Sequence, residues 1–169
     1  MSSTEIIKFK KNGESAVAGT IQNAYRGFVL IWNYFSQKYI GRPYSPHDSL
    51  KLQYEVWDLF DGDKLSDDEK IILGTTYDYV LVKKKNIQRV VDAFGTLSNK
   101  EICRVLNFES VNSSLAEQSE ILQGLLDDED CIAVGWHQLT SSSDMWENYN
   151  CLTGKKHWFL FEDGDKRDR

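Results

Sequence analysis

The chain has 169 residues, of which 41% are hydrophobic and 27% are charged, and its formal net charge is −6. It is too hydrophobic for a disordered chain and long enough to bury one sizeable core. The acidic balance argues against a protein whose main work is to grip the phosphate backbone of nucleic acid.

The first predicted elements are a strand and a long helix. Residues 4–11 have a strand-like pattern and end at Asn12-Gly13, a dipeptide typical of turns. From residue 15 to residue 40 the apolar side chains recur every three or four positions, which predicts a helix. Because such a helix would be about 39 Å long, a break near Gly27 or an earlier end is the alternative.

The rest of the chain alternates between predicted helices and strands. Helical spacing predicts further helices over residues 50–60, 66–73, 86–97, 102–106 and 114–125. Aromatic and β-branched residues predict strands over residues 77–83, 131–139 and 157–161. Ser66 with Glu69, and Ser114 with Glu117, have the spacing of a capping box, which fixes the start of a helix.

This order of elements predicts an α+β fold, with a small antiparallel or mixed sheet packed against several helices. No convincing linker interrupts the chain, so we expect a single domain over residues 1–161. Residues 162–169 lack apolar side chains and are expected to form a disordered tail.

The cysteines and the N-terminal residues bear on the cellular compartment. The chain has three cysteines, an odd number without the close spacing of metal sites, and no signal-peptide pattern at its start. No stretch supplies the roughly 20 apolar residues that a membrane span needs. We therefore expect a cytoplasmic protein with no membrane span, no metal and no cofactor.

Four consecutive carboxylates form the first candidate binding site: Asp127, Asp128, Glu129 and Asp130. Acidic residues at the end of a helix oppose its dipole, so this placement favours a functional reason over a merely solvated helix end. Such a run would attract a basic partner and speed its association.

The second candidate is the long segment between the last two predicted strands. It carries Asp144, Trp146, Glu147 and Tyr149 among small polar residues. Large aromatic side chains beside acids are typical anchors of protein interfaces. The competing interpretation is that the aromatic side chains pack into the domain's own core.

Three sequence stretches resemble small, acidic, cytoplasmic immunity proteins of bacterial polymorphic toxin systems of the contact-dependent inhibition type. They are Y-D-Y-V-L-V-K-K-K running into an amphipathic helix, L-L-D-D-E-D-C-I-A-V-G-W, and G-K-K-H-W-F-L-F. The resemblance covers mainly residues 77–161. It implies a protein without enzymatic activity that binds a basic toxin domain and blocks the toxin's active site by charge and shape.

Two other functions stay open at this point. One is an enzyme acting on a small substrate, with His137, Asp144 and Glu147 as acid and base. The other is an acidic phage or host inhibitor whose carboxylates mimic nucleic acid. Direct binding of nucleic acid is not expected, and the residues do not predict an oligomeric state.

Overall fold

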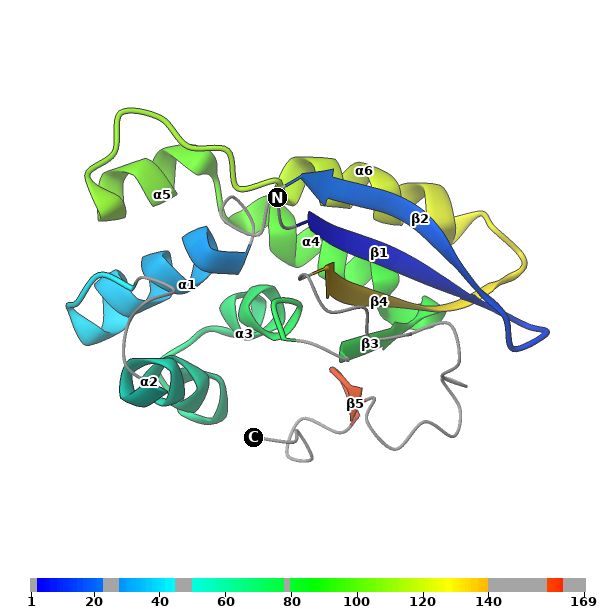
Figure 1. Ribbon diagram of the computed structural model, residues 1–169, viewed down its shortest axis with the longest axis horizontal. Coiled ribbons are helices and arrows are strands. Elements are labelled where there is room, and N and C mark those ends of the chain that lie inside the picture. Colours follow the sequence, from blue (N-terminus) through cyan, green and yellow to red (C-terminus); the bar gives the residue numbers. More distant parts are fainter. Residues whose placement is uncertain (1–2, 23–27, 45–49, 78–79, 140–157, 163–169) are drawn as a thin grey trace.

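The computed structural model describes residues 3–22, 28–44, 50–77, 80–139 and 158–162 (Figure 1). Its strands are β1 (Ser3–Lys10), β2 (Ser15–Gln22), β3 (Val80–Lys83), β4 (Cys131–Leu139) and β5 (Trp158–Phe159). Its α-helices are α1 (Phe28–Phe35), α2 (Leu50–Asp61), α3 (Asp67–Gly74), α4 (Ile87–Thr96), α5 (Asn99–Leu106) and α6 (Leu115–Leu126). A π-helical segment, η1 (Ser36–Ile40), extends α1, and a 3₁₀ turn, η2 (Lys84–Asn86), precedes α4.

The strands form one mixed sheet in the order β2-β1-β4-β3-β5. The neighbouring strands are antiparallel, except for the parallel pair of β3 and β5. The helices α4 and α6 lie along one face of this sheet, and α1, α2, α3 and α5 group beyond one end of its strands (Figure 1). The prediction of an α+β fold with a mixed sheet is confirmed.

The turn predicted at Asn12-Gly13 is present, but it joins two strands of a hairpin, and the helix expected from residue 15 is wrong. Gly13 has φ +86°, and the Lys10 N–H donates to the Glu14 carbonyl at 2.8 Å, which closes the turn. The chain then returns beside β1 as β2, because pairing with β1 satisfies its backbone groups. Within the described residues the helix spans Phe28–Phe35, and its π-helical extension ends at Ile40, just before Gly41, which has φ +79°.

The two predicted capping boxes have different outcomes. The Ser66 hydroxyl accepts from the Glu69 N–H, and the Glu69 carboxylate accepts from the Ser66 N–H, so the first box is confirmed. Ser114 has φ +60° and its side chain makes no capping bond, so the second box is wrong. The helix that follows Ser114 nevertheless forms, because one of its faces is buried against the core.

The main core lies between the sheet and the helices. Ile6, Val134 and Trp136 face α4 and α6 from the central strands and are buried. Ile7 and Phe9 point to the opposite face of the sheet and form a second, smaller cluster with Leu81. Among the described residues, no helix has both the length and the apolar character needed to cross a membrane.

Candidate functional site

The predicted acidic run forms the tight turn between α6 and β4, and Asp128 is its internal anchor. Lys8 Nζ, on β1, donates to Asp128 Oδ2 at 2.7 Å, and the Asp130 N–H donates to Asp128 Oδ1 at 3.0 Å. The hydrogen bond from Lys8 lowers the pKa of the Asp128 carboxyl, and the same bond raises the pKa of Lys8. Asp128 is therefore a charged structural group of the turn.

Hydrogen bonds to backbone carbonyls of the turn hold it from further directions. Lys84 Nζ donates to the Asp128 carbonyl at 2.7 Å, and the Cys131 N–H reaches that carbonyl at 3.1 Å. The Lys11 N–H, from the β1–β2 hairpin, donates to the Asp130 carbonyl at 3.1 Å. The turn is thus fastened to β1, to the hairpin and to the end of β3.

The other three acidic side chains of the turn project into solvent. Asp127, Glu129 and Asp130 are exposed, whereas Asp128 is partly buried. The structure therefore brings the four predicted residues together but divides them into one anchor and three outward carboxylates.

Lysines surround this turn, which the sequence did not predict. Lys11, Lys83, Lys84 and Lys85 line a shallow hollow of about 530 Å³ together with Glu129. Charges of both signs therefore alternate at this end of the sheet.

Part of the lysine group is already paired. Glu162 Oε2 accepts from Lys83 Nζ at 2.6 Å, and Glu162 Oε1 lies 3.6 Å from Lys85 Nζ. The hydrogen bond from Lys83 lowers the pKa of the Glu162 carboxyl. Glu162, placed in the predicted tail, thus contacts the sheet, and residues 163–169 lie outside the described residues.

The second predicted site cannot be placed. Asp144, Trp146, Glu147 and Tyr149 all lie outside the described residues. His137, from the enzyme alternative, is buried on β4, and its Nδ1 lies 4.0 Å from Glu5 Oε2 on β1. Its two proposed partners in that alternative, Asp144 and Glu147, lie outside the described residues.

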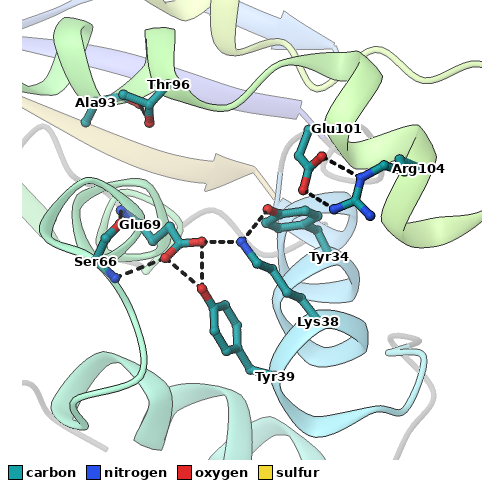
Figure 2. Close-up of polar contacts among 9 residues, drawn as sticks. All are labelled: Tyr34, Lys38, Tyr39, Ser66, Glu69, Ala93, Thr96, Glu101 and Arg104. Carbon is teal, nitrogen blue, oxygen red and sulfur yellow. Dashed lines mark hydrogen bonds and ion pairs between the residues drawn. The ribbon is translucent and has the colours of Figure 1, made fainter.

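Sequence reasoning missed a polar cluster between η1 and α3 (Figure 2). Lys38 Nζ donates to Glu69 Oε1 at 2.8 Å and to Tyr34 Oη at 3.0 Å. The Tyr39 hydroxyl donates to both Glu69 oxygens at 2.8 Å, and Glu69 is also the third residue of the capping box described above. The only sequence signal was the spacing of Tyr34 and Lys38, four residues apart in one helix.

The protonation states in this cluster favour a structural role. Burial alone would raise the pKa of Glu69, but hydrogen bonds from Lys38, Ser66 and Tyr39 outweigh it and lower that pKa. Burial alone would lower the pKa of Lys38, but its bonds to Glu69 and Tyr34 raise it instead. A lysine that acts as a nucleophile needs a lowered pKa, not a raised one. We therefore interpret the cluster as a structural link that holds η1 against α3.

Within the described ranges, no three histidine, cysteine, aspartate or glutamate side chains gather closely enough to hold a metal ion. Comparisons of the chain with protein-family models, with curated proteins and with solved structures find no match.

Proposed function

We propose that the protein binds and neutralises a cationic protein toxin, and that the turn of residues 127–130 is the part that attracts it. The observation that carries this proposal is that the four carboxylates of the turn have two different roles. Asp128 is held by Lys8 and by backbone groups, while Asp127, Glu129 and Asp130 point outward. A fastened turn presents its charges without a large loss of conformational entropy on binding.

The distribution of charge around the turn favours a protein partner over a simple cation. The lysines beside the turn would repel a uniformly positive surface, so the partner must match a pattern of both signs. Such a pattern supports specificity, because a wrong partner would place like charges together. Stoichiometric blocking of this kind needs no catalytic group in the inhibitor.

Co-expression with a toxin tests the proposal. The test protein is the product of a gene that neighbours this chain's gene, selected by the criterion that its expression alone arrests cell growth. We expect the wild-type chain to restore growth and to bind the purified toxin domain with an association rate that falls as salt is added. Reversing three charges, Asp127→Lys, Glu129→Lys and Asp130→Lys, should slow association by roughly 10- to 100-fold at low ionic strength.

A matched triple variant controls for net charge. Asp63, Asp92 and Glu109 are exposed acidic residues away from the turn, so their change to lysine alters the net charge equally. That control should slow association far less than the reversal at the turn. Equal effects of the two variants, salt-independent association or failure to restore growth would each refute the proposal.

A further inference from the structure

Strand β2 forms one edge of the sheet in the described part of the chain. It is the outermost strand, and within the described part of the chain it pairs only with β1. An edge strand of eight residues presents a row of backbone N–H and C=O groups that another extended chain can use.

The usual protections of such an edge are largely missing from β2. Its sequence, S-A-V-A-G-T-I-Q, contains no charged residue and no proline. One protection is present, since the register with β1 shifts so that Ala18 is an extra, bulged residue. The bulge divides the edge into two short stretches and favours a partner that matches this register.

The two faces beside this edge differ in chemistry. Val17 lies opposite Ile7, on the sheet face away from α6, and is 52% exposed. On the other face α6 lies over β2, where a Cβ atom added at Gly19 would be only 2.5 Å from Ile121 Cδ1. A strand added here would therefore meet an apolar side chain on one face and α6 on the other.

The flank of α6 at this edge is acidic. Glu117 lies one helical turn before Ile121 and so on the same side of the helix, and it is exposed. The Glu117 carboxylate has no ion-pair partner among the described residues. Downstream, the same helix ends at the acidic turn of residues 127–130.

We propose that β2 accepts an added strand from a cationic partner, an extended segment with alternating aliphatic and basic residues. Its backbone pairs with the open edge, its aliphatic side chains contact Val17, and one of its basic side chains faces Glu117. The inference rests on the proposed function, because it names the part of a cationic partner that docks beside the turn of residues 127–130.

Short peptides test the docking mode directly. The probe is an acetylated, amidated octapeptide of alternating valine and lysine, measured by fluorescence anisotropy and by hydrogen exchange of the full-length protein. We expect saturable binding and slower exchange of amides within Ser15–Gln22. A peptide of alternating valine and glutamate should not bind.

Backbone methylation separates strand pairing from charge attraction. Successive N–H groups of a strand point to opposite edges, so N-methylation of all valines blocks one edge and N-methylation of all lysines blocks the other. One methylated peptide should lose at least about tenfold in affinity, because several backbone hydrogen bonds are lost, while the other binds within about twofold of the parent. Equal binding by all three peptides would overturn the proposal, since charge alone would explain it.

Protein variants complete the test. The variant Glu117→Gln should weaken binding of the parent peptide by about two- to threefold, while the matched variant Glu109→Gln should not. Sedimentation showing that the protein alone dimerises, with Ser15–Gln22 already protected from exchange, would make a second copy the occupant and overturn the proposal. The strand can fail these tests while the turn still neutralises the toxin, so the two proposals fail separately.

Discussion

Removing the Glu69 carboxylate should destabilise the fold substantially, because one side chain joins three parts of the structure. It accepts from Lys38 and Tyr39 on η1, and it closes the capping box with Ser66. Its side chain is only 15% exposed. A hydrogen bond to a charged group contributes about 1.5 kcal/mol or more, and a helix cap about 1 kcal/mol. Allowing for rehydration of the partly exposed Lys38, we expect Glu69→Ala to lower the free energy of unfolding by about 2–3 kcal/mol.

Urea denaturation followed by tryptophan fluorescence measures this loss. The control is Glu101→Ala, which removes a carboxylate that, among the described residues, forms its ion pair with Arg104 on the surface of α5, and it should cost much less. Glu69→Gln keeps a side chain that can complete the cap, so its effect should lie between the two. A Glu69→Ala variant as stable as the Glu101→Ala variant would refute the reasoning.

The pH dependence gives an independent check on Glu69. Its pKa is lowered in the folded state from an ordinary value of 4.5, so between the two values the unfolded chain binds more protons. The stabilisation is therefore complete above pH 4.5 and is lost as the pH falls through the folded-state value. The difference in stability between wild type and Glu69→Gln should shrink over that acidic range and stay constant from pH 5 to 8.

Three smaller changes test the packing and the turn. Gly19→Val should cost about 1–3 kcal/mol through overlap with Ile121, and adding Ile121→Ala should recover part of that loss in a double-mutant cycle. Gln118→Leu should cost about 1–3 kcal/mol in chemical denaturation, because it removes the buried acceptor, at 2.9 Å, of the Trp136 indole N–H. Asp127→Asn should raise the free energy of unfolding by about 0.3–1 kcal/mol, because it removes a negative charge from the C-terminal end of α6. A slightly higher thermal midpoint would show this gain.

The sequence predicted most elements after residue 50, because there the apolar spacing and the packing agree. It failed at residues 15–22 for a physical reason. The bulge at Ala18 places Val17 and Ile21 on opposite faces of the sheet, so the alternation that marks a strand is broken. Val17 and Ile21 are four positions apart, as in a helix, and this spacing indicated a helix. The turn signal of Asn12-Gly13 indicated a hairpin instead.

The acidic turn of residues 127–130 also shows what could not be predicted from the sequence. Its four carboxylates could be read from the sequence, but the distinct role of Asp128 could not. Lys8 lies 120 residues away along the chain and reaches Asp128 because β1 pairs with β4. The cluster around Glu69 likewise joins side chains about 30 residues apart, which no local pattern reveals.

Stability alone does not account for the composition of the acidic turn. Asp127 adds a negative charge where the dipole of α6 is already negative, and Glu129 and Asp130 bring further negative charge beside it. Lys8 offsets part of this repulsion, because it pairs with Asp128 and also attracts Asp130. An arrangement that costs stability while fixing the direction of its charges is typical of a surface kept for binding. The stability gain expected for Asp127→Asn and the slower toxin association expected on charge reversal are therefore two consequences of the same placement.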